Sequence, residues 1–185
     1  MIKPLQSVAL IISALIVSFQ SSIAYEIPQR RIDLKPYINL MFPDKLLQFE
    51  NQDCRVEDKM GIGFGIKART QIAGCWGFVI NTSITDLQVT DNSLSTASIF
   101  TAGFFYTRVT QLGQIALDAG LGVISVADHS AMLFMPGLEY SREIAERISL
   151  SAEINMPIAN DWFNKYDIKE DYKSIAIAIG GTIIF

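Results

Sequence analysis

Large apolar side chains recur at every second position over most of this chain, which is the period of a β-strand. The alternation is clearest over 60–69, where Met60, Ile62 and Phe64 alternate with glycines, and over the last eleven residues, 175–185. The same pattern predicts six further strands, at 32–42, 72–90, 98–109, 114–126, 131–142 and 147–156. We therefore predict an all-β chain of about eight strands.

The composition indicates where these strands lie. Half of the residues are apolar, and the mean hydropathy is +0.29. The terminal run is too short for a transmembrane helix, but it has the length of a tilted transmembrane strand, about 9–11 residues. Strands of a membrane barrel carry apolar residues on the lipid face and small or polar residues on the other face. The sequence thus predicts a closed antiparallel up-and-down transmembrane β-barrel.

The end of the chain carries a more specific signal. Phe185 is a terminal aromatic residue, Ile183 lies two positions before it, and Gly180 lies five before it. This ending resembles that of bacterial outer-membrane β-barrels, and the whole pattern is similar to the transmembrane-domain family of outer-membrane protein A. The resemblance implies that the barrel-assembly machinery reads these three residues. It also implies an address in the outer membrane of a Gram-negative cell envelope, with outer-membrane lipids and lipopolysaccharide as neighbours.

The amino terminus supports export through the general secretory pathway. Lys3 is followed by an apolar run over 8–19 and by Ser22-Ile23-Ala24, a small-x-small cleavage site. We predict that residues 1–24 are a cleaved signal peptide and that residues 25–185 form one barrel domain.

The predicted connections differ in length. Segments 43–59 and 157–171 lack periodicity and carry many charges, so we interpret them as long external loops that contact an extracellular ligand. We expect short connections at 91–97 and 127–130 and a turn near 70–71. An even number of strands places both termini at the periplasmic end. Pro136 predicts a bulge or a break in its strand, because a closed sheet has no free edge for it.

Six charged residues fall on the inward face of the predicted barrel. Charges in a narrow lumen are costly unless they are paired, so opposite signs at similar heights predict an ion-pair network. We interpret the network as a plug, and a gated water or ion path, a small porin-like pore, is the alternative. The six residues are Lys35, Lys67, Arg69, Asp118, Glu139 and Glu153.

An enzymatic alternative depends on His129, the single histidine. Lipid A deacylases resemble this chain in size, signal and barrel, and they use a His, a Ser and a Glu. The corresponding set here is His129, Ser130 and Glu139. However, adjacent strand residues point to opposite faces, and Glu139 lies roughly 25–30 Å farther along its strand at about 3.3 Å per residue. We therefore favour a solvated loop histidine.

Other chemistry receives little support from the sequence. A net charge of −4 makes nucleic acid an unsuitable partner, and no metal-ligand cluster or cofactor motif is present. A Cys54–Cys75 disulfide would suit an oxidising compartment, but the predicted topology separates the two residues by about 20 Å, beyond the roughly 7 Å that a disulfide allows. We predict a non-enzymatic outer-membrane barrel with a structural or adhesin-like surface-interaction role.

Overall fold

The protein is seen here as a computed structural model that describes residues 32–44, 47–48, 55–56, 59–88, 94–127, 129–160, 168 and 172–185. In these residues eight long strands form the wall, and three two-residue strands accompany them. The strands are β1 Ile32–Pro43, β2 Leu47–Gln48, β3 Arg55–Val56, β4 Gly61–Ala73, β5 Trp76–Gln88, β6 Leu94–Thr110, β7 Gly113–Val126, β8 His129–Ala145, β9 Ile148–Asn155, β10 Ile158–Ala159 and β11 Tyr172–Ile184.

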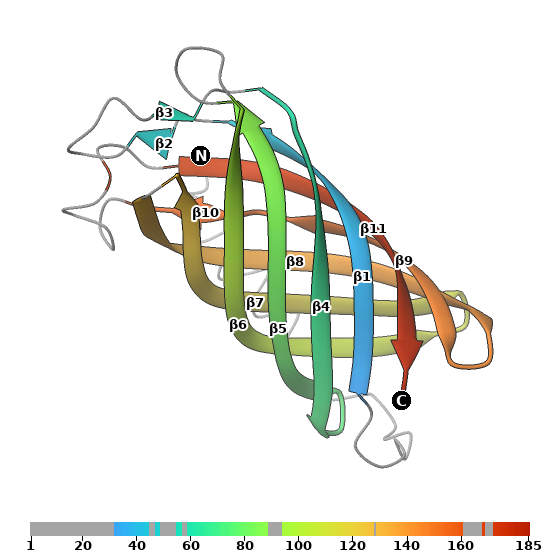
Figure 1. The fold of residues 1–185 in the computed structure, drawn as a ribbon. Helices are drawn as coiled ribbons and strands as arrows, with labels where there is room; N and C mark the ends of the chain where they lie inside the picture. The colour runs from blue at the N-terminus through green and yellow to red at the C-terminus, as the bar shows by residue number, and fades with distance from the viewer. Residues whose placement is uncertain are drawn as a thin grey trace, which may run out of the picture.

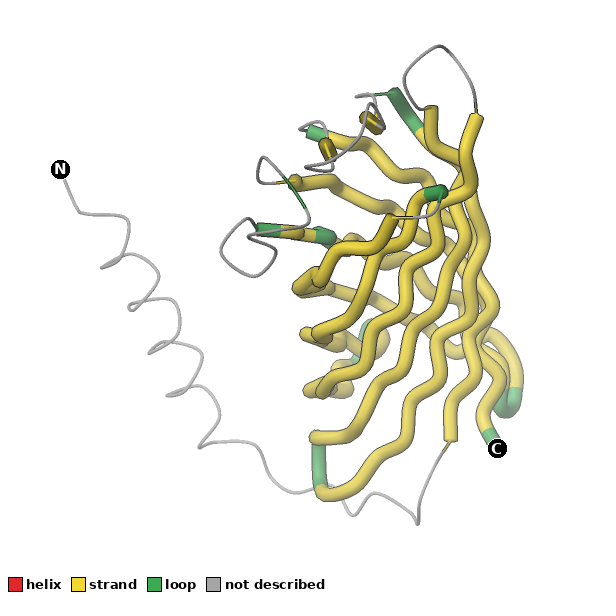
Figure 2. Tube along the Cα trace, turned by 60° about the vertical axis from the view of Figure 1, so that its left-hand side comes forward, coloured by secondary structure: helices red, strands yellow, loops and turns green. Residues whose placement is uncertain are grey.

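The wall closes on itself. Each long strand pairs antiparallel with the next long strand along the chain, and β11 returns to pair with β1, so that Leu34 lies opposite Ile183 and Phe42 opposite Ile175. Figure 1 shows this closure, and Figure 2 shows the strands running side by side around the wall. The prediction of a closed antiparallel up-and-down barrel of about eight strands is confirmed.

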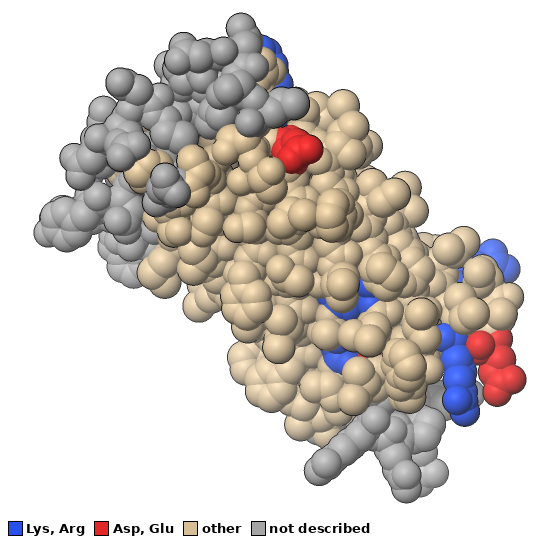
Figure 3. All heavy atoms as spheres, in the orientation of Figure 1, with Lys and Arg blue, Asp and Glu red and all other residues tan. Residues whose placement is uncertain are grey.

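Alternation sorts the side chains between the two faces of the wall. Outward positions carry large exposed apolar groups, such as Phe64, which is 62% exposed, and Ile179, which is 65% exposed. Toward the C-terminal end, inward positions carry mainly glycine, small, polar or charged residues, and toward the loop end they also carry large apolar residues such as Leu87 and Leu133. The large side chain of Phe105 also points inward and is buried. Figure 3 shows residues other than Lys, Arg, Asp and Glu over most of this face of the wall, and the charged residues lie mainly toward the end where the C-terminus lies, with a few midway along the wall and at the loop end.

The first hairpin turn lies later in the chain than the sequence predicted. The expected turn near 70–71 is wrong, because β4 continues to Ala73 and pairs there with Trp76. The turn consists of Gly74 and Cys75, and Gly74 has a φ of 52°, which glycine adopts without the penalty that a Cβ imposes. Alternation alone does not locate this turn, since the outward positions continue through it unchanged.

Pro136 does not break its own strand, so that prediction is wrong in its location. β8 runs continuously through it, and the interruption falls on the partner, between β9 and β10. The Met156 backbone N–H donates to the Pro136 carbonyl oxygen at 2.9 Å. In an antiparallel ladder both backbone groups of a residue face the same neighbour, so the N–H that proline lacks would have bonded to Met156. β9 therefore ends at Asn155.

The segments predicted as aperiodic loops contain ordered structure at the end of the wall opposite the C-terminus. Within 43–59, β2 and β3 pair with each other, and within 157–171, β10 pairs with β8 and β11 (Figure 1). Val56 and Ile168 are buried and belong to the same apolar cluster as wall residues. The expected connections at 91–97 and 127–130 are also shorter than predicted, because β6 begins at Leu94 and β8 at His129.

Candidate functional site

Six charged side chains meet inside the barrel, and the strand register explains how. Lys35 on β1 lies directly opposite Lys67 on β4, and Glu139 on β8 lies directly opposite Glu153 on β9. Like charges in such positions repel each other. Both pairs point into the lumen, and closure of the wall places the lysine pair across from the glutamate pair. Each repulsive pair is therefore stabilised by the other.

The contacts form a closed network of three cations and three anions. Lys35 Nζ donates to Glu139 Oε2 at 2.6 Å and also binds Glu153. Lys67 Nζ donates to Asp118 Oδ2 at 2.9 Å and also binds Glu153.

Arg69 links the carboxylates of Glu139 and Asp118. Its Nη1 lies 2.9 Å from Glu139 Oε1 and its Nη2 lies 2.8 Å from Glu139 Oε2, a bidentate contact. The same Nη2 lies 2.9 Å from Asp118 Oδ2. Every member of the network thus contacts two members of opposite charge.

The network is almost completely shielded from solvent. Lys67 and Glu153 are each 1% exposed, and the other four members are also buried. Removing a charge from water costs several kcal/mol in a protein interior unless its partners replace the lost hydration. Aromatic rings add contacts, since the Arg69 guanidinium lies 5.4 Å from the Phe105 ring centroid and Lys35 Nζ lies 5.6 Å from that of Tyr37. The arrangement is suited to filling this part of the lumen with equal numbers of positive and negative side chains.

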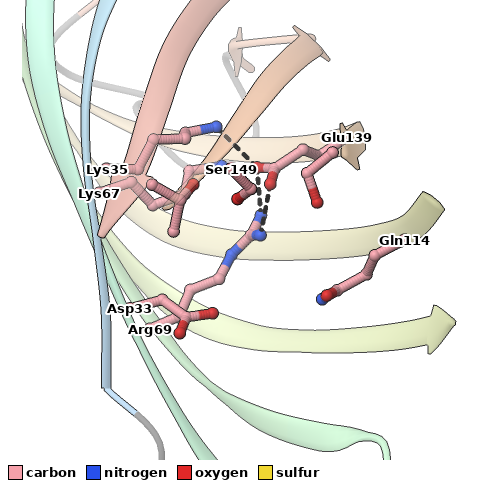
Figure 4. Close-up of a pocket in the computed structure, with 9 residues that line it drawn as sticks. Asp33, Lys35, Lys67, Arg69, Gln114, Glu139 and Ser149 are labelled. Atoms are coloured by element: carbon pink, nitrogen blue, oxygen red, sulfur yellow. Dashed lines mark hydrogen bonds and ion pairs between the residues drawn. The ribbon is translucent and has the colours of Figure 1, made fainter. Parts of the chain in front are cut away.

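A small cavity lies beside the network toward the C-terminal end of the barrel. Its volume is about 10 Å³, which is room for roughly one water molecule. Figure 4 shows Lys35, Arg69 and Glu139 reaching toward one another across it, with Gln114 at the side. The residues that line it are Asp33, Lys35, Lys67, Arg69, Gln114, Glu139, Ser141, Ser149 and Thr182.

A layer of neutral polar groups follows the network toward the loop end. Tyr37 Oη donates to Asn81 Oδ1 at 2.6 Å, and Asn39 Nδ2 donates to Thr85 Oγ1 at 3.0 Å. A second cavity of about 10 Å³ lies at this level. The Tyr37 side chain packs between Gly65 and Gly180, where an added Cβ would lie 2.4 Å and 2.8 Å from its atoms.

Beyond that layer the interior is apolar. The buried cluster there consists of Met41, Val56, Leu87, Ala97, Ile99, Ile124, Val126, Ala131, Leu133, Met135, Ala159, Ile168, Tyr172 and Ala176. We did not predict this core from the sequence. The signal was present, because Met41, Ile99 and Leu133 occupy inward positions of the predicted alternation.

The structure does not assemble His129, Ser130 and Glu139 into one site. His129 and Ser130 begin β8, and the Ser130 hydroxyl lies 2.7 Å from that of Ser125 on the outward face. Glu139 is ten residues farther along the same strand, about 33 Å at 3.3 Å per residue, and is held by Lys35 and Arg69. The expectation that His129 lies in a loop is wrong, since the strand already includes it.

Two residues of the C-terminal ending, Gly180 and Ile183, lie on β11, the strand that closes the barrel, and Phe185 directly follows the end of that strand. Gly180 faces Tyr37, as described above, while Ile183 and Phe185 point outward and are exposed. The Phe185 backbone N–H donates to the Ile32 carbonyl oxygen at 3.0 Å. Packing against Tyr37 gives Gly180 a role within the folded wall.

Several sequence predictions fall outside the described residues. These are the signal peptide at 1–24 and Cys54, so the predicted separation of Cys54 from Cys75, which argues against a disulfide, stays a prediction. In the described part of the chain, no group of three or more His, Cys, Asp or Glu residues is placed to hold a metal ion. No helix within those same residues has the length and apolar character needed to cross a membrane.

Comparison with known proteins identifies the fold. Neither a protein-family model nor a curated protein matches the sequence. Among solved structures, Neisserial surface protein A is similar, with a TM-score of 0.58 at 12% identity over 83% of this chain and 96% of that one. Ail, the attachment invasion locus protein of Yersinia pestis, gives a TM-score of 0.54 at 13% identity over 86% and 100%. The outer membrane protein AlkL gives 0.58 at 7% over 89% and 94%.

These similarities and the closed eight-stranded wall define the class. The chain has the fold of the small outer-membrane β-barrel proteins.

Proposed function

We propose that this chain is an integral outer-membrane β-barrel with a closed interior, which serves a structural and surface-interaction role. The outer face of the wall supports membrane insertion, because large apolar side chains are exposed there on every long strand. A protein that stays in water rarely exposes an apolar surface of this extent. The similar folds of proteins whose names place them in the outer membrane or at the cell surface support the same address.

The observation that carries the closed interior is the ion-pair network. It links side chains of five strands, β1, β4, β7, β8 and β9, across the lumen. All of its members are buried. The apolar cluster fills the opposite half of the lumen and includes Val56 and Ile168 from outside the long strands. Beside these two fillings, the described residues line two cavities of about 10 Å³ each. We therefore favour a plug over the alternative of a gated pore.

The remaining parts of the proposal follow from the sequence. Residues 1–24 direct export, and Gly180, Ile183 and Phe185 present the ending that the barrel-assembly machinery recognises. Segments 43–59 and 157–171 lie at the end of the barrel that would face the exterior, where they would meet an extracellular ligand. The name of the similar Yersinia pestis protein, which refers to attachment and invasion, supports such a contact role.

Heat modifiability tests the barrel. Residues 25–185 are refolded in detergent and run on a denaturing gel with and without boiling. We expect faster migration before boiling, because a closed barrel resists the detergent. A variant without Phe185 is expected to refold in detergent, where no assembly machinery acts, and to reach the outer membrane of cells in reduced amount. Equal migration of boiled and unboiled samples would overturn the proposal.

Conductance in a planar lipid bilayer separates the plug from the pore. We expect no channel steps from the refolded protein. Lys67→Glu, which leaves two cations facing four anions, is expected to produce steps or to prevent refolding. The matched control is Lys173→Glu, which reverses an exposed charge on β11. Regular channel steps from the unaltered protein would favour the pore.

A further inference from the structure

The outward face of β6 changes character twice along its length. From Phe100 to Phe104 it is apolar, and Phe100 is 52% exposed. Toward the loop end the next outward residues are Ser98 and Thr96, and toward the other end Tyr106 is followed by Arg108. Both Ser98 and Arg108 are exposed. The apolar stretch of this strand therefore has a polar boundary at each end.

The boundary at the loop end is a continuous row of hydroxyl groups. Ser98 on β6 lies opposite Ser125 on β7, which lies opposite Ser130 on β8. One row toward the C-terminal end, Phe100, Val123 and Met132 are paired across the same three strands, and all three are exposed and apolar. The change from hydrocarbon to hydroxyl thus occurs at one level across three strands.

The boundary at the other end consists of aromatic residues followed by arginine. On β6 Tyr106 precedes Arg108, and on β8 Tyr140 precedes Arg142. Trp76 lies opposite Tyr106, with ring centroids 5.1 Å apart. Aromatic side chains of this kind lie at membrane–water interfaces, and long basic side chains near them extend their charges toward the headgroups.

The separation of the two boundaries matches a bilayer. Ser98 and Arg108 are ten residues apart, about 33 Å along the strand at 3.3 Å per residue. At a tilt of about 40° this becomes roughly 25 Å, the height of the apolar band of outer-membrane barrels. Ser130 and Arg142 on β8 are twelve residues apart, which corresponds to roughly 30 Å on the same basis.

Beyond the hydroxyl row the two faces of the wall exchange character. On the β5–β6 hairpin Asp86 and Thr96 are exposed polar residues, and Thr96 Oγ1 donates to Asp86 Oδ1 at 3.2 Å. The inward residues Leu87 and Ala97 are buried in the apolar cluster. Polar outside and apolar inside is the arrangement of a sheet that faces water. At Asp86 and Thr96 the outer face therefore presents polar groups, which suit water and not lipid tails.

We propose that the hydrocarbon of the bilayer contacts β6–β8 between the Ser98–Ser125–Ser130 row and the level of Arg108 and Arg142, and that these two arginines lie among the phospholipid headgroups. The tip of the β5–β6 hairpin then stands outside the hydrocarbon as a water-facing sheet. This inference rests on the proposed membrane location. It adds the depth at which the wall sits in the bilayer and the residues that lie among the headgroups.

Spin labels measure the depth directly. Single cysteines replace Thr96, Ser98, Ala102, Phe104 or Arg108 in a background with Cys54→Ser and Cys75→Ser, and each is labelled and refolded into phosphatidylcholine vesicles. Oxygen collects in hydrocarbon, whereas a nickel chelate stays in water. We expect the ratio of oxygen to nickel collision rates to be several-fold higher at positions 102 and 104 than at 96, 98 and 108.

The possible outcomes distinguish an error in the proposed depth from an error in the proposed membrane location. A high ratio at position 98, equal to that at 102, would overturn the placement and leave the membrane location intact. A low ratio at all five positions would overturn both. Heat-dependent migration of each labelled variant ensures that only folded barrels are compared.

Phosphorus NMR tests the depth of positions 108 and 142, where a labelled cysteine replaces each arginine. We expect both labels to shorten the phosphorus relaxation time of the phospholipid headgroups several-fold more than a label at position 104, which lies within the apolar band. Equal effects from positions 104, 108 and 142 would overturn the assignment of the arginines to the headgroup level.

Discussion

The two halves of the barrel interior are filled in opposite ways. Toward the C-terminal end, six buried charges interlock across the lumen. Toward the loop end, aliphatic side chains of the wall pack with Val56 and Ile168. Charged groups require partners at set distances and directions, whereas apolar groups require mainly complementary volume. The difference indicates that the charged half fixes the relative positions of the strands. The apolar half can also bury residues from outside the long strands, such as Val56 and Ile168.

A neutral polar layer separates the two halves. Tyr37, Asn39 and Asn81 lie there, linked in part by the Tyr37–Asn81 hydrogen bond. The cost of a substitution should therefore depend on its level in the barrel. It should be highest where a charge loses its partner and lowest where one neutral hydrogen bond is lost.

The largest effect is expected from Glu153→Gln. Glu153 binds both Lys35 and Lys67, so its neutralisation leaves two buried ammonium groups with one carboxylate each. Loss of one partner of a buried ion pair costs about 3–5 kcal/mol. Urea unfolding in phospholipid vesicles measures the loss. Glu143→Gln, an exposed site on the same strand pair, is the control, and equal stability of the two variants would contradict the role of the network.

A smaller loss is expected from Leu133→Ala in the apolar half. Leu133 is buried in the cluster, and its truncation leaves a cavity that costs about 2–4 kcal/mol. The same unfolding measurement applies. The control is Leu121→Ala on the outward face of β7, where lipid or detergent fills the space. If both truncations had the same effect, the interior at this level would not be closely packed.

Val56→Ala weakens the contact between β3 and the wall. Val56 is fully buried, and deletion of two carbon atoms costs about 1–2 kcal/mol at roughly 0.8 kcal/mol each. We also expect faster cleavage of segment 43–59 by added protease. Val109→Ala, at an exposed position near the opposite end, serves as the control. Unchanged stability and unchanged cleavage would show that β3 does not contribute to the core.

The smallest effect is expected from Tyr37→Phe in the layer between the halves. The variant keeps the ring between Gly65 and Gly180 and removes only the hydroxyl that donates to Asn81. A net loss of about 1 kcal/mol is expected from one buried neutral hydrogen bond. The control is Tyr140→Phe, because the Tyr140 hydroxyl donates to the Leu112 carbonyl oxygen at an exposed site. This variant should lose less stability than Tyr37→Phe. A loss as large as that of Glu153→Gln would show that Tyr37 belongs energetically to the charged half.

The sequence predicted which six residues form the ion-pair network, but it predicted only part of how they are arranged. Alternation alone placed Lys35, Lys67 and the other four charges on the inward face, because a period of two depends on local backbone geometry. It did not reveal that Lys35 lies beside Lys67 and Glu139 beside Glu153. Those like-charge neighbours are acceptable only because closure of the wall sets the two pairs opposite each other.

The sequence by itself determined most of the strands and their faces, since both follow from alternation within a single segment. Its apolar composition and its C-terminal ending indicated the closed class of fold. The tertiary structure decided the level at which side chains from different strands meet, because that depends on strand register and on the inward fold of segments without periodicity. Val56 and Ile168 illustrate the second case. No local pattern marks them as core residues, and only the wall around them buries them.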